Sequence, residues 1–364
     1  MKAKSLNDNQ EIGTVKIKIN NLNNQKMMPD NSNDQPIQNN NIKNIVASAK
    51  NIQNNNNNNN NNDNNNYNNN SLNTSNTFEH NNVSPSTIAQ LKKIVNKADL
   101  LNIEIINSLR LQNNLKIKIN ALGMISNSKR KAYDGNTFFG FVQNYNENEE
   151  NDVTDDANID IKDVDFIIKP RENCPDNNNI IGRHFRIRFD INTMKYYIKD
   201  LGCGYGTFKK IMDVTKLKDS YLINIGNSYI VFTFGVDEYD LDGKAIADAD
   251  KILNIKVFSE VPKADPYFFN PQQFKKVYVG RDISCNIIVD DSLLSRVHCT
   301  IEFKDDVGWV IYDGRCEDDD PSKYRPSTNG TWLYLIEETQ IDDGMIFKSN
   351  QNVYECKIIK QDQS

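Results

Sequence analysis

Three short polar motifs in the last quarter of the chain carry residues that could bind an anion. They are Gly280-Arg281, Ser295-Arg296-Val297-His298 and Thr328-Asn329-Gly330-Thr331. Each adjoins an apolar stretch with the alternation of a β-strand, so we expect each motif in a loop at a strand end, where binding residues usually lie. Arginine, hydroxyl and amide groups that converge there would suit a doubly charged group with many acceptor oxygens. Phosphate is such a group.

The order and spacing of these motifs resemble the signature of the forkhead-associated (FHA) domain over residues 251–361. Gly-Arg alone carries no information, and Asn-Gly alone is an ordinary hairpin turn. The ordered triple among strand-like segments is specific. The resemblance implies a β-sandwich that binds phosphothreonine-containing proteins and has no catalytic activity.

The resemblance also implies a role for each ligand residue. Arg281 would be the principal phosphate ligand because its planar guanidinium fork matches phosphate oxygens, although a surface salt bridge is the simpler alternative. The Ser295 hydroxyl would donate to phosphate, and Arg296 would add a second positive contact. Thr328 would reach the phosphate or the peptide, and the amide of Asn329 would hold the peptide backbone.

The remaining motif residues are expected to be structural: Gly280, His298, Gly330 and Thr331. A histidine close to Ser295 would also fit a Ser-His hydrolase. That alternative needs an orienting acid, an oxyanion hole and a substrate pocket, and the sequence signals none of them. The resemblance implies instead that His298 is structural and braces the binding loop, and the chain keeps a histidine at position 184, in a segment without the phosphate ligands.

Alignment of the chain with itself indicates a second, degenerate copy of the same pattern. His298 precedes Asp313 by 15 residues (313 − 298), and His184 precedes Asp200 by 16 (200 − 184), with two alternating strands between them in both cases. The loop after Asp200 ends in Gly-Thr, like that of the FHA pattern. We expect a degenerate FHA-like domain over residues 113–236.

The degenerate copy differs where the ligands should be. Phe141, Ile181 and Tyr205 stand at the positions of Arg281, Ser295 and Asn329, so we expect this copy not to bind phosphate. Gly182-Arg183 could be taken for the Gly-Arg motif. However, Arg183 lies 24 residues before Thr207 (207 − 183), against 50 between Arg281 and Thr331 (331 − 281), too few for the intervening strands. Arg183 is thus beside the histidine, as a possible remnant of phosphate affinity.

The other segments complete an all-β architecture of two sandwiches in tandem. Residues 1–83 are dominated by Asn and should form a disordered tail, because they have few aromatic side chains to bury. Residues 84–112 show apolar residues at helical spacing after Ser84-Pro85, which predicts a helix docked on the first sandwich. Residues 237–250 read as an acidic linker.

The composition of the chain limits the kinds of partner that we expect. The net charge of −6 argues against a general nucleic-acid binder, and no apolar run approaches the length of a membrane span. We expect an intracellular protein, nuclear or cytoplasmic. The six cysteines show no C-x-x-C pair and there are only three histidines, so no metal or cofactor is expected.

An insertion in the second copy bears on the residues that flank the phosphate. Asp313 to Thr331 spans 18 residues (331 − 313) and Asp200 to Thr207 spans 7 (207 − 200), a difference of 11. The insertion holds four consecutive acids at 317–320, which would disfavour acidic ligand flanks if they face the site. Alternatively, the loop points away. The function that we expect is phosphothreonine-peptide binding by an adaptor; a phosphate-independent interaction or structural role is the alternative.

Overall fold

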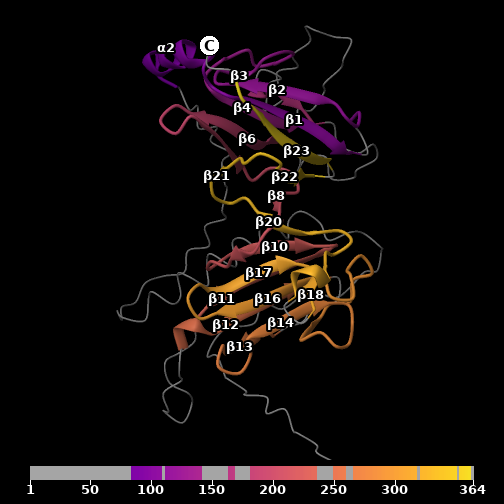
Figure 1. The fold of residues 1–364 in the computed structure, drawn as a ribbon. Coiled ribbons are helices and arrows are strands. Elements are labelled where there is room, and N and C mark those ends of the chain that lie inside the picture. The colour runs from indigo at the N-terminus through magenta and orange to yellow at the C-terminus, as the bar shows by residue number, and fades with distance from the viewer. Residues whose placement is uncertain are drawn as a thin grey trace, which may run out of the picture.

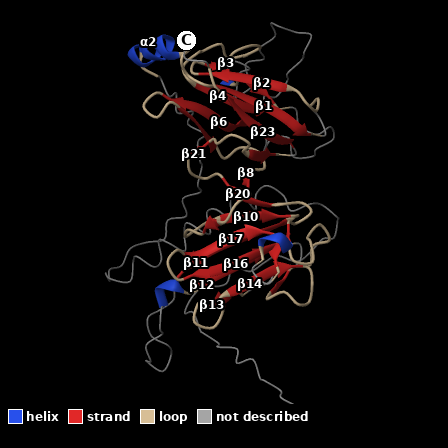
Figure 2. Ribbon diagram, viewed as in Figure 1, coloured by secondary structure: helices blue, strands red, loops and turns tan. Residues whose placement is uncertain are grey.

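The computed structural model describes residues 83–108, 111–141, 163–168, 181–235, 249–259, 265–317, 320–350 and 352–361. The predicted all-β class is confirmed: within these residues, one short α-helix accompanies many strands (Figures 1 and 2). Residues 1–82 of the Asn-rich tail and most of the acidic linker lie outside the described residues.

The strands build two sandwiches, which lie one above the other in Figure 1. One face of the first sandwich is a sheet of five strands in the order β21-β7-β6-β4-β5. These strands are β4 (Asn136–Phe141), β5 (Phe166–Ile167), β6 (Gly182–Asp190), β7 (Lys195–Asp200) and β21 (Thr339–Gln340). The facing strands are β1 (Leu100–Asn107), β2 (Lys116–Asn120), β3 (Gly123–Met124), β22 (Ile346–Ser349) and β23 (Asn352–Ile359).

The second sandwich has the same plan. Its five-stranded sheet has the order β15-β14-β16-β17-β9. These strands are β9 (Thr215–Lys216), β14 (Lys276–Gly280), β15 (Ile287–Ile288), β16 (Cys299–Lys304) and β17 (Gly308–Asp313). The facing strands are β10 (Leu222–Ile225), β11 (Ser228–Phe234), β12 (Leu253–Phe258) and β13 (Tyr267–Phe269). The 3₁₀ helix η3 (Ala249–Lys251) precedes β12.

A single long sheet joins the two sandwiches. It has 11 strands in the order β13-β12-β11-β10-β20-β8-β22-β23-β1-β2-β3. Its centre is the antiparallel pair of β8 (Thr207–Lys210) and β20 (Thr331–Tyr334), in which Trp332 lies opposite Lys210 and Tyr334 opposite Phe208. Outward from this pair, β10, β11, β12 and β13 on one side correspond to β22, β23, β1 and β2 on the other, where β3 adds one more strand. The pair therefore marks an approximate two-fold axis.

The two predicted copies exchange their closing hairpins across this axis. The hairpin β10–β11, from the first copy in sequence, pairs with β12 of the second sandwich over six residue pairs from Tyr229↔Phe258 to Phe234↔Leu253. The hairpin β22–β23, from the second copy, pairs with β1 of the first sandwich. Strands of the predicted domain 113–236 therefore pair with strands of the predicted domain 251–361. Apolar periodicity identifies these segments as strands but does not say which sandwich each hairpin completes.

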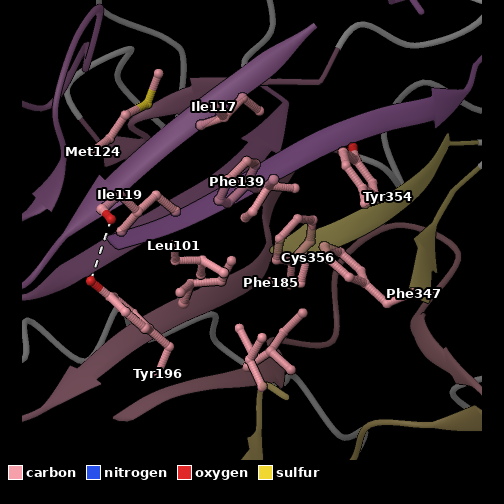
Figure 3. Close-up of a cluster of buried hydrophobic side chains, with 14 of the residues drawn as sticks. Leu101, Ile117, Ile119, Met124, Phe139, Phe185, Tyr196, Phe347, Tyr354 and Cys356 are labelled. Carbon is pink, nitrogen blue, oxygen red and sulfur yellow. Dashed lines mark hydrogen bonds between the residues drawn. The ribbon is translucent and has the colours of Figure 1, made fainter. Parts of the chain in front are cut away.

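The cores show that the exchange is substantial. Phe347, Tyr354 and Cys356 from the C-terminal hairpin lie fully buried among residues of β1, β4 and β6, as Figure 3 shows. Phe347 stacks on Tyr354, and both rings contact Phe185 edge-on. In the second sandwich, the first copy contributes the buried side chains of Ile223, Ile225, Ile230 and Phe232. Each such side chain contributes about 1.5–3 kcal/mol on burial.

The helix prediction over 84–112 is correct only at its beginning. The helix α2 (Pro85–Ile94) starts after Ser84, whose side chain accepts a hydrogen bond from the Thr87 amide, and it docks through buried Leu91. Residues Leu100–Asn107 form β1 instead. Leu101, Ile103 and Ile105 alternate at period two and are all buried, and β-branched residues favour a strand.

Candidate functional site

The three motifs meet at one end of the second sandwich around an open cavity of about 370 Å³. The cavity is lined by Arg281, Ser292, Leu293, Leu294, Ser295, Arg296, Thr328 and Asn329. All five predicted ligand residues are therefore brought together. Sequence reasoning missed Ser292, Leu293 and Leu294, whose only signal was their place in the loop just before Ser295.

Gly280 allows the two arginine-bearing segments to lie against each other. A Cβ atom at Gly280 would stand 2.1 Å from the Arg296 carbonyl oxygen, so no other residue fits. Beyond it, the Arg281 amide donates to the Ser295 carbonyl at 3.3 Å and the Asp282 amide to the Arg296 carbonyl at 3.1 Å. This backbone pairing holds Arg281 and Arg296 on adjacent segments at the cavity edge.

Both arginine side chains are exposed, and neither forms a salt bridge within the described part of the chain. The pKa of neighbouring Asp282 is lowered first by its hydrogen bond from the Ser284 amide and also by the positive charges of Arg296 and Arg281. The surface-salt-bridge alternative for Arg281 thus has no partner among the described residues. The cavity edge is locally positive in a chain with net charge −6.

The hydroxyl groups of Ser295 and Thr328 connect two of the loops that line the cavity. The Thr328 amide donates to the Ser295 Oγ at 2.9 Å, and the hydroxyl oxygens of these two residues are 3.3 Å apart. Hydroxyl hydrogens can rotate to suit a ligand. Two hydroxyls beside two guanidinium groups form a set of donors suited to phosphate oxygens.

His298 braces these loops from below and is fully buried. Its Nδ1 accepts from the Ser295 amide at 3.2 Å, and its Nε2 lies 3.1 Å from the Gly330 carbonyl oxygen, to which it must donate. Burial lowers the pKa of His298, so the ring is neutral with its proton on Nε2. Both ring nitrogens are occupied by backbone groups, which leaves neither to activate the Ser295 hydroxyl.

A second buried network supports the Thr328-Asn329 loop. The Asp313 carboxylate accepts from the Ser327 amide, the Ser327 hydroxyl and the Thr331 hydroxyl at 3.0, 2.7 and 2.7 Å. The Ser327 hydroxyl accepts in turn from the Gly330 amide at 2.9 Å. Gly330 has φ +76°, a conformation that favours glycine. Ser327 was not predicted, although it directly precedes the motif.

Asn329 ties this loop to the other side of the cavity. Its side-chain amide donates to the Leu293 carbonyl at 2.7 Å, and its own carbonyl accepts from the Trp332 indole at 2.9 Å. Asn329 is exposed at the cavity edge.

The first sandwich carries the same backbone arrangement without the ligands. Gly140 pairs with Arg183, and a Cβ at Gly140 would stand 2.2 Å from the Gly182 carbonyl, just as at Gly280. This places Phe141 where Arg281 stands. Arg183 donates to the Asp163 carbonyl at 2.8 Å and lies over the Phe138 ring at 4.1 Å.

The insertion after Asp313 forms a small hairpin of β18 (Arg315–Cys316) and β19 (Tyr324–Arg325), with the 3₁₀ helix η4 (Pro321–Lys323) between them. Arg315 lies opposite Arg325, and Arg315 pairs with Glu317 at 3.4 Å. Asp318 and Asp319 lie outside the described residues. The predicted preference against acidic flanks therefore stays a prediction.

Fold and site define a class: an all-β interaction module with a cationic, hydroxyl-rich cavity at strand ends. Residues 277–349 match the family model of the FHA domain, so the prediction of an FHA domain in this part of the chain is confirmed. The degenerate first copy over residues 113–236 stays a prediction. FHA domains are protein-interaction modules that recognise phosphorylated peptides. A comparison with curated proteins finds no match. Within the described part of the chain, no helix has the length and hydrophobicity needed to span a bilayer.

Proposed function

We propose that this protein is a non-enzymatic adaptor that binds phosphothreonine-containing proteins through the cavity of its second sandwich. The observation that carries the proposal is the pair of exposed arginines, Arg281 and Arg296, beside the Ser295 and Thr328 hydroxyls. Neither arginine forms a salt bridge to any residue that the structure describes. In an acidic chain, unpaired guanidinium groups that share one cavity favour an external anion as their partner.

Each ligand residue has a distinct part in this function. Arg281 and Arg296 pair with phosphate oxygens, and the hydroxyls of Ser295 and Thr328 donate to the same group. Asn329 holds the extended peptide backbone with its amide. His298 and Asp313 do not touch the ligand. They hold the two loops at the spacing that the phosphate requires.

An oriented peptide screen on the full chain tests the proposal. Libraries with fixed phosphothreonine, phosphoserine or unmodified threonine should give selection with phosphothreonine, weaker selection with phosphoserine and none with threonine. Equal binding of the unmodified library would favour the alternative function, a phosphate-independent interaction protein. The full chain is required because each sandwich is completed by a hairpin from the other copy.

A further inference from the structure

The exchanged hairpin of the first copy reaches the binding loop of the second. The turn between β10 and β11 contacts Asp291, a buried residue four positions before Ser295. One oxygen of its carboxylate, Oδ2, accepts from the Asn227 amide at 2.7 Å and from the Ser228 hydroxyl at 3.0 Å. Asn227 and Ser228 lie 64 and 63 positions before Asp291, in the other copy of the pattern.

The same carboxylate continues into the cavity wall. Its other oxygen, Oδ1, accepts from the Leu293 amide at 2.9 Å, and the Asp291 carbonyl accepts from the Leu294 amide at 3.0 Å. Leu293 and Leu294 line the cavity, and the Leu293 carbonyl accepts from the Asn329 side chain. An unbroken series of hydrogen bonds therefore runs from the first copy's turn through Asp291 to Asn329.

The turn fits only because it contains Gly226. This residue has φ +54°, and a Cβ there would stand 2.7 Å from Asp291 Oδ2 and 2.8 Å from Leu294 Cδ1. The corresponding residue of the other hairpin is Asn350, since β10 and β22 begin 124 residues apart (346 − 222) and 350 − 226 is also 124. Asn350 has φ +55°, so the two turns share a backbone conformation.

The side chain of Asn350 is used in the first sandwich. Its Oδ1 accepts from the Tyr205 amide at 2.9 Å, and its Nδ2 donates to His184 Nδ1 at 2.8 Å. If each hairpin instead completed the sandwich of its own copy, Asn350 would place a side chain against Asp291. Gly226 would then stand where Asn350 now stands and could not form these two hydrogen bonds with Tyr205 and His184. The two turns are therefore fitted to the exchanged arrangement.

We propose that the phosphopeptide site is composite. The β10–β11 turn of the first copy, acting through Asp291 as a positioning residue, sets the 291–295 loop against Asn329. The inference rests on the proposed function and gives the degenerate first copy a role within it: the first copy completes the binding site of the second.

The test uses full-length variants and one phosphothreonine peptide selected by the wild type. Gly226→Asn keeps the backbone conformation, because Asn tolerates this region, but adds the interfering side chain. Asp291→Asn keeps the shape and removes the charge. We expect each to weaken peptide binding about tenfold. The matched control, Asn350→Gly in the other turn, should leave affinity within about twofold although it destabilises the first sandwich.

A spectroscopic readout separates positioning from general destabilisation. The Trp332 indole donates to the Asn329 carbonyl, and the chain has only two tryptophans, so its indole N–H resonance is readily assigned. That resonance should shift in folded Gly226→Asn and Asp291→Asn and not in Asn350→Gly. If Gly226→Asn does not fold, Asp291→Asn carries the test. Wild-type affinity and an unmoved resonance in folded Asp291→Asn would overturn the composite site, whereas failure of the wild type to bind would overturn the proposed function.

Discussion

At the scale of single residues, the site separates groups that face the cavity from groups that hold the loops. Arg281, Ser295 and Arg296 are open to the cavity, whereas His298 and Asp313 are buried beneath it. The sequence predicted this division for His298 because the histidine persists in a copy without phosphate ligands. Asp291 could not be predicted in the same way, since its partner is a turn from the other copy.

Replacement of Arg281 should therefore affect binding without affecting folding. Arg281→Ala is expected to lower phosphopeptide affinity about tenfold or more, because a hydrogen bond to a charged group contributes about 1.5–3 kcal/mol. Arg281→Lys should restore only part of the loss, since the fork geometry is absent. Calorimetric titration measures both, with exposed Lys118→Ala as a control that removes one positive charge elsewhere.

Replacement of His298, in contrast, should reduce the stability of the fold. His298→Ala leaves the Ser295 amide and the Gly330 carbonyl without their partner and is expected to cost about 2–4 kcal/mol of unfolding free energy. Ser295→Ala should cost much less stability while still weakening peptide binding. Chemical denaturation of the two variants checks the contrast, and equal destabilisation by both would contradict it.

The pKa of His298 predicts how this contrast depends on pH. Burial lowers its pKa in the folded state, so the unfolded chain binds the proton more readily. The stability that neutral His298 provides is fully present above the ordinary pKa of about 6.5 and declines as pH falls below it. The difference between wild type and His298→Ala should therefore shrink from pH 7.5 to pH 5. A constant difference would show that the ring does not fold in its neutral form.

At the scale of elements, the sequence located most strands but not all their partners. The hairpins after His184 and His298 follow from period-two apolar residues, and both are present as β6–β7 and β16–β17. The segment 100–107 was misread because a short apolar run fits helical and strand periods almost equally. The exchange escaped prediction because its determinant is a side-chain fit, with Gly226 in one turn and Asn350 in the other.

Exchange predicts that residues 250–364 cannot form the FHA domain alone. This fragment lacks Ile223, Ile225, Ile230 and Phe232, whose burial contributes roughly 6–12 kcal/mol, comparable to the whole stability of a domain. We expect no cooperative unfolding transition by circular dichroism and no phosphopeptide binding. A fragment that folds and binds like the full chain would show that its own β22–β23 hairpin can replace β10–β11.

At the scale of the whole molecule, the approximate two-fold axis brings a charged residue into the junction. Lys348 lies 124 residues after Asn224 (348 − 224), and its ammonium donates to the Asn224 side-chain oxygen at 2.5 Å. The rings of Trp332 and Phe208 lie 4.6 and 5.6 Å away. Burial lowers the pKa of Lys348 to about 7. The centre of the long sheet thus contains a lysine that loses its proton near neutral pH.

The direction of the Lys348 pKa shift determines how the unfolding free energy of the protein depends on pH. In the unfolded chain the Lys348 pKa is near 10.4, so between about pH 7 and 10 the unfolded state binds the extra proton and stability rises with pH. Lys348→Met removes this dependence. The unfolding free energy of the wild type relative to Lys348→Met should increase over that interval. A flat difference would show that the Trp332 and Phe208 rings keep the ammonium charged.

The most direct test of the account is a calorimetric titration of the full chain with one phosphothreonine peptide and its unphosphorylated twin. We expect saturable binding of the phosphopeptide and none of the twin. Gly226→Asn and Arg281→Ala should each weaken that binding, whereas Asn350→Gly and Lys118→Ala should not. Equal binding of both peptides, or a phosphopeptide affinity that no change at residues 226, 281 or 291 alters, would contradict a composite phosphate-reading site.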